Sequence, residues 1–274
     1  MTTKTQKQGE LAILEHSQLP VNADLLGMMQ VDSKAGLGNV NQEDIATPFL
    51  KILQALSPQV KKQRPEYIEG AEEGMIYNTV SKQVFDGRKG LRIIPCGYMR
   101  RYVEWRPNMG GFAADHGTDS SLYKKCLKNE RGVPTTPEGN EIVAYATWYV
   151  LVVDDVTGAF EPAVISMTSS QFKVSTTWMA SITQLQLPTG DSKGFFNPAI
   201  FDRAFRLTTK PESNDQNDWF GWKVEPENFT LLLPNGKVLR DAAKSFCELI
   251  NQGSYKVAVP DEPVKDDTAV TDAF

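Results

Sequence analysis

The sequence is poor in residues that bind metals or form disulfides. It contains two histidines, His16 and His116, and neither has a second histidine or a cysteine at ligand spacing. Its three cysteines, Cys96, Cys126 and Cys247, are odd in number, far apart and without a C-x-x-C pair. This pattern indicates neither a zinc site nor a disulfide framework. We therefore expect buried thiols and no metal cofactor.

Long apolar runs and a secretion leader are also missing. The sequence has no run of 18 apolar residues, and its first twenty residues, MTTKTQKQGELAILEHSQLP, are polar. A membrane-spanning helix needs about 20 consecutive apolar residues, and a secretion signal needs a charged and then an apolar segment. We therefore expect a cytoplasmic protein without membrane contact.

Enzyme motifs are absent as well. GxSxG, GxxxxGK[ST] and GxGxxG do not occur, which leaves no nucleophile elbow and no phosphate-binding loop. The segment AADHGTD could supply Asp115, His116 and Asp119 to a metal or hydrolytic site, but its flanking glycines favour a mobile loop. A nuclease would require a divalent-metal site that these residues do not form. We therefore expect a protein that is not an enzyme and has no cofactor.

Charge, in contrast, is concentrated in one block. Residues 82–131 carry 11 basic and 5 acidic side chains, although the whole chain has a net charge of -5. A basic block in an otherwise negative protein attracts a polyanion locally, while the negative remainder disfavours indiscriminate adhesion.

The pattern after Gly74 predicts mainly β-strands. Residues 75–107 read as strands broken at Asn78, Asp86-Gly87 and Gly90. The segment EIVAYATWYVLVV is apolar on both alternating faces, which predicts a central strand covered on both sides, and DDVTG predicts a turn into the next strand. Two further strands are expected in PAIFDRAFRLTTK and DWFGWKVE.

Helical spacing is confined to a few segments. Apolar residues at 172–185 and at 239–250 recur with the period of a helix, and a short helix is expected near Ala23–Met29. IATPFLKILQALSP fits either a helix or a strand. The sequence predicts an α+β fold with a mostly antiparallel β core, OB-like or another β-rich barrel or sheet, and two or three helices. We expect a flexible N-terminal arm (1–44), a single domain (45–260) and a disordered acidic tail (261–274).

The segment GYMRRYVEWRP lies inside the basic block. As a strand it places Tyr98, Arg100, Tyr102, Glu104 and Arg106 on one face, and the other face is apolar apart from Arg101. Aromatic rings interleaved with guanidinium groups suit exposed bases and phosphates. We therefore expect Tyr98, Arg100, Arg101, Tyr102 and Arg106 to contact nucleic acid. We expect Arg88, Lys89 and Arg92 to lie beside this strand in a hairpin. The track could continue through four more cations, namely Lys124, Lys125, Lys128 and Arg131.

The same residues fit a second interpretation. Tyrosine and arginine are also enriched in protein interfaces, so the strip could serve a structural, scaffolding or virion protein. A second aromatic cluster, Trp219, Phe220 and Trp222, lacks a dense basic neighbourhood, and we expect it to belong mainly to the core.

The chain ends in DEPVKDDTAVTDAF, which is too polar to order itself. Its acidic residues imitate a polyanion and can lie over the basic strip, and Phe274 can enter an apolar pocket of a partner. Asp266, Asp267, Asp272 and Phe274 are the expected partner-binding residues.

This tail is similar to the C-terminal segments of bacterial and podovirus single-stranded DNA-binding proteins. The body resembles phage-encoded proteins of this type through PFLKILQALSPQV, GMIYNTV, YVEWRP followed by GGF, and FRLTTKPESND with WFGWKVE. The resemblance implies a β-rich DNA-binding core and single-stranded DNA as ligand. It also implies a role in replication or recombination, or recruitment of an RNA polymerase. Self-association is left open.

Overall fold

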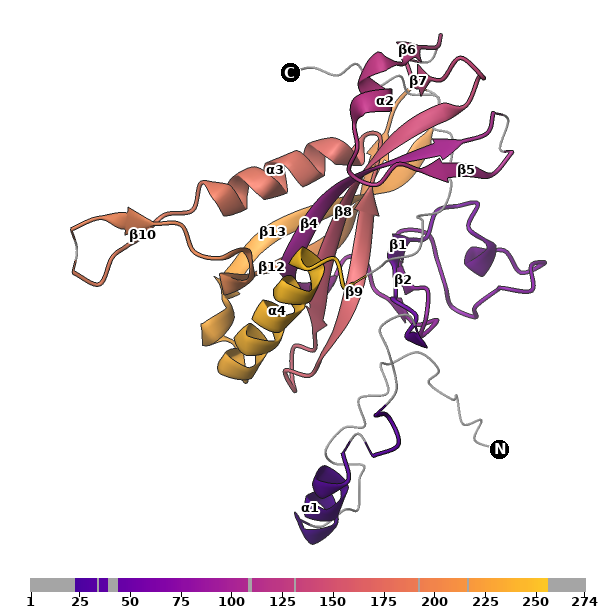
Figure 1. Ribbon diagram of the computed structural model, residues 1–274. Coiled ribbons are helices and arrows are strands. Elements are labelled where there is room, and N and C mark those ends of the chain that lie inside the picture. Colours follow the sequence, from indigo (N-terminus) through magenta and orange to yellow (C-terminus); the bar gives the residue numbers. More distant parts are fainter. Residues whose placement is uncertain are drawn as a thin grey trace, which may run out of the picture.

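The computed structural model describes residues 23–33, 35–38, 44–107, 110–130, 132–191, 193–215 and 217–255. The expected tail (261–274) and most of the expected arm (1–44) lie outside these residues. The described part is an α+β structure with mostly antiparallel sheets, as predicted (Figure 1). None of its helices is long and apolar enough to span a membrane.

The main sheet has two long central strands, β4 (Leu91–Trp105) and β8 (Glu141–Val153). The strand order is β13-β12-β4-β8-β7-β6, with β5 on β4 and β9 on β8. The outer strands are β5 (Phe112–Asp115), β6 (Leu127–Lys128), β7 (Pro134–Thr135), β9 (Phe160–Met167), β12 (Arg203–Ser213) and β13 (Asp218–Phe229). The sheet curls into a half-barrel (Figure 1), and the described strands at its two ends do not pair with each other.

Two helices cover opposite faces of this sheet. Trp148 of β8 packs with Trp178 of α3 (Gln171–Thr183), whereas the next residue, Tyr149, packs with Phe246 of α4 (Gly236–Asn251). Side chains alternate between the faces of a strand, so β8 is buried on both sides, as its apolar sequence predicts. Its last ten residues are all buried.

A small sheet stands against the edge of the large one. It contains β1 (Leu50–Ile52), β2 (Ile76–Asn78) and β3 (Val84–Phe85), in that order. A parallel bridge between Phe49 and Val164 joins it to β9. The segment around Leu50 therefore forms a strand, which settles the choice between helix and strand.

The remaining elements are short. Helix α1 (Ala23–Val31) confirms the helix expected near Ala23–Met29, and α2 (Ser121–Lys125) is a single turn. The described chain thus has four α-helices, more than the two or three expected. Between α3 and β12 a hairpin of β10 (Leu187–Pro188) and β11 (Phe195–Phe196) extends away from the body (Figure 1). The described residues also include short 3-10 helices at Pro58–Val60, Ile200–Asp202 and Thr230–Leu232.

The turn between β8 and β9 follows from its sequence. The carboxylate of Asp154 accepts hydrogen bonds from the backbone N–H groups of Val156 and Thr157, at 3.1 and 2.7 Å. Gly158 has a φ of +69°, a conformation that glycine adopts without strain. The turn predicted from DDVTG is confirmed, and the carboxylate of Asp154 acts there as a hydrogen-bond acceptor for the backbone.

Candidate nucleic-acid interface

Strand β4 is continuous from Leu91 to Trp105, which corrects the expected hairpin. Arg92 and Arg100 lie on the same strand, and eight residues at about 3.3 Å per residue separate them by roughly 25 Å. Arg88 and Lys89 are exposed in the turn before β4, at the far end from Tyr98. The backbone N–H of Arg88 donates to Asp86, which explains that turn. These three cations therefore do not form one patch with the tyrosine strip.

Arg92 is engaged in an ion-pair cluster. Its guanidinium group contacts Asp155 at 2.8 Å and Glu227 at 2.7 Å. Arg206 contacts the same two carboxylates at 2.8 and 2.7 Å. The cluster ties β4, β12 and β13 to the turn after β8 and neutralises both arginines. In this structure the guanidinium of Arg92 is thus engaged by two carboxylates, whereas the sequence predicted that it would hold a phosphate.

Two further residues of the predicted strip are buried. Arg101 is 8% exposed and pairs with Asp115 of β5. Tyr102 is 7% exposed, because Tyr123 of α2 covers it with the two ring centres 4.9 Å apart. In this structure both side chains are therefore covered, although the sequence placed them among the residues that contact bases and phosphates.

Tyr98 and Arg100 remain accessible, because they lie between the two parts of the sheet face that α3 and α2 cover. Tyr98 is 36% exposed, and its ring centre lies 4.9 Å from that of Trp148. The guanidinium carbon of Arg100 lies 4.9 Å from the ring centre of Phe172, the second residue of α3. This stacking holds the planar cation over an aromatic ring and leaves it exposed.

Three exposed lysines follow closely in the chain on aromatic residues that pack next to this pair. Lys124 and Lys125 are exposed on α2, directly after the Tyr123 that packs on Tyr102, and Lys173 is exposed directly after Phe172. We call the group the Tyr98–Arg100 surface; it consists of Tyr98, Lys124, Lys125, Arg100, Phe172 and Lys173. The sequence indicated the first four of these residues. Phe172 and Lys173 were missed, because only the tertiary packing brings the start of α3 to β4.

Burial also affects the ionisation of Tyr98. Partial burial raises the pKa of its phenol above the ordinary value, although the nearby Arg100 acts in the opposite direction. A tyrosine with a raised pKa is neutral at neutral pH. Tyr98 therefore offers an uncharged ring beside the cations.

The last cation of the strip lies farther away. Arg106 is exposed just beyond the end of β4, and it donates a hydrogen bond to the backbone carbonyl of Phe112. This hydrogen bond links the end of β4 to the start of β5. Arg106 lies about 20 Å along the strand from Arg100. Lys128 lies in β6, and Arg131 lies outside the described residues.

The histidine-containing segment is partly strand and partly turn, because of its three candidate residues only Asp115 belongs to β5 and residues 116–120 form the turn that follows, as the expected loop implies. Asp115 ends β5, the Nε2 atom of His116 lies 2.9 Å from Glu104, and Asp119 accepts a hydrogen bond from the backbone of Ser121. The described chain contains no group of three histidine, cysteine, aspartate or glutamate residues that could hold a metal ion.

The cysteines are free thiols. Cys96 is buried, and burial raises the pKa of its thiol, whereas Cys126 and Cys247 are half-buried. The expectation of buried thiols is therefore confirmed for Cys96 alone. In the second aromatic cluster Trp222 is buried, and Trp219 and Phe220 are half-buried, so that cluster belongs mainly to the core as expected.

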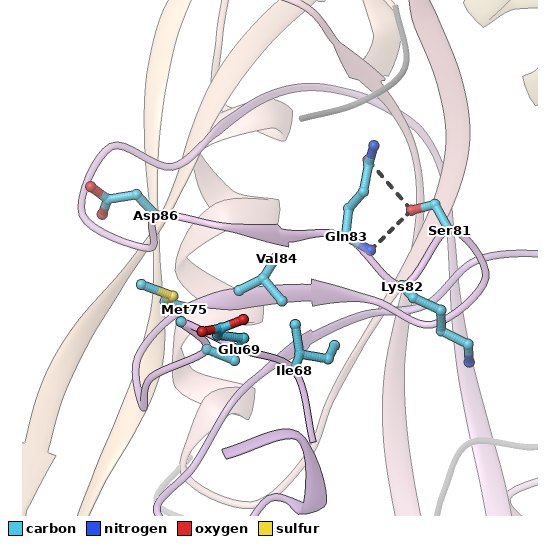
Figure 2. Close-up of a pocket in the computed structure, with 10 residues that line it drawn as sticks. Ile68, Glu69, Met75, Ser81, Lys82, Gln83, Val84 and Asp86 are labelled. Atoms are coloured by element: carbon cyan, nitrogen blue, oxygen red, sulfur yellow. Dashed lines mark hydrogen bonds between the residues drawn. The ribbon is translucent and has the colours of Figure 1, made fainter. Parts of the chain in front are cut away.

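A cavity lies on the small sheet, away from the Tyr98–Arg100 surface. Its volume is about 650 Å³, and Figure 2 shows it around the turn between β2 and β3. Ile68, Met75 and Val84 provide apolar lining, and Glu69, Lys82 and Asp86 are its charged residues. With two carboxylates and one ammonium group, this lining does not favour a polyanion.

The fold and this surface define an α+β protein whose curled antiparallel sheet carries an exposed cation-and-aromatic surface between two helices. The family model described as Pam3 phage gp34-like protein matches residues 15–256. The chain therefore belongs to the Pam3 phage gp34-like family and is a phage protein. No curated protein and no solved structure matches the chain.

Proposed function

We propose that this phage protein binds single-stranded DNA without catalysing a reaction, and that the Tyr98–Arg100 surface is where it does so. The observation that carries the proposal is the exposed guanidinium of Arg100, held over Phe172 next to the exposed ring of Tyr98. Stacking of bases on aromatic rings, with cations along the phosphates, is the usual mode of sequence-independent single-strand binding.

Each group has a distinct role in this proposal. A base stacks on the ring of Tyr98. The guanidinium of Arg100, already fixed by Phe172, donates hydrogen bonds to a phosphate. Lys124 and Lys125 on one side and Lys173 on the other attract neighbouring phosphates. A duplex keeps its bases stacked internally, so it gains only the phosphate contacts.

The proposed setting is phage DNA replication or recombination, or transcription as a polymerase cofactor, in the cytoplasm of the host cell. The C-terminal residues Asp266, Asp267, Asp272 and Phe274 would contact replication proteins or an RNA polymerase. These residues lie outside the described part of the chain, and their charge and terminal aromatic ring support the proposal.

The test is fluorescence anisotropy with labelled single-stranded and duplex oligonucleotides of equal length across a salt series. We expect a preference for the single strand. Tyr98→Ala should weaken binding by about 5-fold to 150-fold, since one base–aromatic stack contributes about 1–3 kcal/mol. Arg100→Ala should also weaken it, because a charge-assisted contact to a phosphate is lost. Binding equal to the parent protein in both variants would refute the assignment of the surface.

A matched pair of double variants separates local contacts from net charge. Lys124→Ala/Lys125→Ala should flatten the slope of log K against log salt, by about 0.7 for each lost phosphate contact. Lys237→Ala/Lys244→Ala removes the same charge from α4, which covers the opposite face of the sheet. We expect that control to leave the slope unchanged, and equal effects of the two double variants would contradict a localised interface.

A second candidate function is assembly through protein contacts, as in a scaffolding or virion protein. It is favoured by Phe195 and Phe196, which are 71% and 47% exposed on the projecting hairpin. Binding to neither oligonucleotide at micromolar protein and low salt would exclude the first candidate and favour this one.

A further inference from the structure

The β10–β11 hairpin is an ordered arm with aromatic side chains on both faces. Phe195 and Phe196 are neighbours on one strand, so they point to opposite sides of the hairpin, and both are exposed. A single flat contact could cover only one of them. Phe195 is the more exposed of the two, so it is the main apolar group that the arm can offer to one contact.

The arm is held in place at its base and its tip. At the base, the side-chain amide of Asn197 donates to the carbonyls of Thr183 and Leu185, at 2.8 and 2.9 Å. At the tip, Thr189 bonds to Asp191 and to the backbone of Gly194. A preformed arm loses little conformational entropy on docking, which favours a specific contact.

The charge of the arm argues for a protein partner. Asp191 and Lys193 are the charged residues between Leu187 and Phe196, and their charges cancel. A neutral arm gains little from phosphates, whereas exposed phenylalanines gain from apolar burial.

The same chain carries an uncovered apolar surface at another place. Leu231 and Leu232 are 58% and 72% exposed, Val238 on the first turn of α4 is 59% exposed, and Val156 in the β8–β9 turn is 86% exposed. The amide of Asn235 donates to the carbonyl of Thr157 at 3.1 Å, which joins these segments at one end of the molecule (Figure 1). We call these four residues the Leu232 patch.

We propose that the β10–β11 arm of one molecule packs on the Leu232 patch of a second copy of this chain. The patch is apolar like the arm, and exposed Lys237 and Asp241 of α4 lie beside it. Lys237 can form an ion pair with Asp191 of the arm, and Asp241 can form one with Lys193. Because arm and patch are different surfaces, the contact either closes as a dimer in which each copy places its arm on the other, or repeats head to tail into a ring or a chain of copies.

The test is multi-angle light scattering and sedimentation velocity of the full chain from 1 to 100 μM. The parent protein should show a mass of at least twice 30.5 kDa at the higher concentrations. Phe195→Ser/Phe196→Ser and Leu231→Ser/Leu232→Ser should each be monomeric. Leu56→Ser/Leu127→Ser removes two other exposed leucines, 79% and 83% exposed, and should associate like the parent.

Mixing the two monomeric variants gives the decisive measurement. The arm variant retains an intact patch and the patch variant retains an intact arm, so an equimolar mixture should form a heterodimer. A parent protein that is monomeric throughout, association that survives either double variant, or a mixture that stays monomeric would each overturn the proposal. Circular dichroism checks that each double variant is folded. The single variant Phe195→Lys, at the more exposed phenylalanine of the arm, tests the same contact with one substitution.

Discussion

At the scale of single residues, a buried hydrogen bond fixes the aromatic stack beneath Tyr98. The indole N–H of Trp148 donates to the hydroxyl of Ser175 at 2.9 Å, and both side chains are buried. Trp148 in turn stacks on Trp178 with ring centres 3.8 Å apart. This contact connects α3 to the central strand and so places the start of α3 near Arg100.

Ser175→Ala should therefore lower the free energy of unfolding by about 1–3 kcal/mol, because it leaves the buried indole N–H of Trp148 without its acceptor. Urea unfolding followed by fluorescence measures this change. Ser181→Ala is the control on the same helix, because its exposed hydroxyl bonds only to the helix's own carbonyl of Trp178. Equal losses in the two variants would contradict a special role for the Trp148–Ser175 bond.

Glu161 gives a prediction about pH. Burial raises its pKa above the ordinary value of 4.5, while a hydrogen bond from Asn78 acts in the opposite direction. The folded state thus disfavours the ionised form, and this penalty is present above the folded pKa and disappears as pH falls below the ordinary value. Glu161→Gln keeps an acceptor oxygen for Asn78 and should raise the melting temperature at pH 7.

The gain from Glu161→Gln should disappear at acidic pH, where the parent side chain is protonated as well. Thermal unfolding of both proteins from pH 3.5 to 7.5 measures the difference. Glu225→Gln, at an exposed position of β13, is the control and should show no such pH-dependent gain. A difference between parent and Glu161→Gln that stays constant with pH would contradict the explanation.

At the scale of elements, the edge of the large sheet is blocked by side chains. Strand β13 ends the strand order. The side-chain amide of Gln54 donates to the carbonyl of Phe220 and accepts from its N–H, at 2.8 and 2.9 Å. Gln171 accepts from the N–H of Trp222 at 2.7 Å, and Pro226 has no N–H to offer. These contacts reduce the edge-to-edge pairing that an open strand invites.

Gln54→Ala should expose the backbone of Phe220 at this edge. We expect a loss of about 1–2 kcal/mol in unfolding free energy, because two half-buried backbone groups lose their partners. Aggregation on gentle heating, followed by light scattering, should also begin earlier. Gln252→Ala, at an exposed position after α4, is the control. An unfolding free energy of Gln54→Ala equal to that of the parent would show that water replaces the amide without cost.

At the scale of the whole molecule, the acidic tail and the basic block carry net charges of opposite sign. Residues 261–274 contribute five acidic and one basic side chain, so their deletion changes the net charge from -5 to -1. Less negative charge favours association with a polyanion. Deletion of 261–274 should therefore leave single-strand affinity equal or tighter, with the larger effect at low salt.

Anisotropy titrations of the full and shortened chains in 50 and 200 mM salt measure this effect. A full-length variant with Asp266, Asp267 and Asp272 changed to asparagine is the control for charge without loss of length. It should follow the deletion if electrostatic competition is the cause. Clearly weaker binding of the shortened chain would mean instead that the tail itself contributes to the DNA contact.

The sequence by itself determined the types of the main elements and the central place of β8. Its uninterrupted apolar residues require cover on both faces, the spacing at 239–250 defines one apolar helix face, and Asp154 with Gly158 specifies a turn. These are local consequences of side-chain period and backbone preference. They hold before any long-range contact is known.

Only the tertiary structure decided which residues of the predicted strip stay accessible. Alternation correctly placed Tyr98, Arg100 and Tyr102 on one face, but α2 covers Tyr102 and leaves the other two exposed. Arg92 looked free in the sequence, yet it meets carboxylates that lie 63 and 135 residues away in the chain. Exposure and ion pairing depend on contacts between distant segments, and the period of a strand carries no information about those partners.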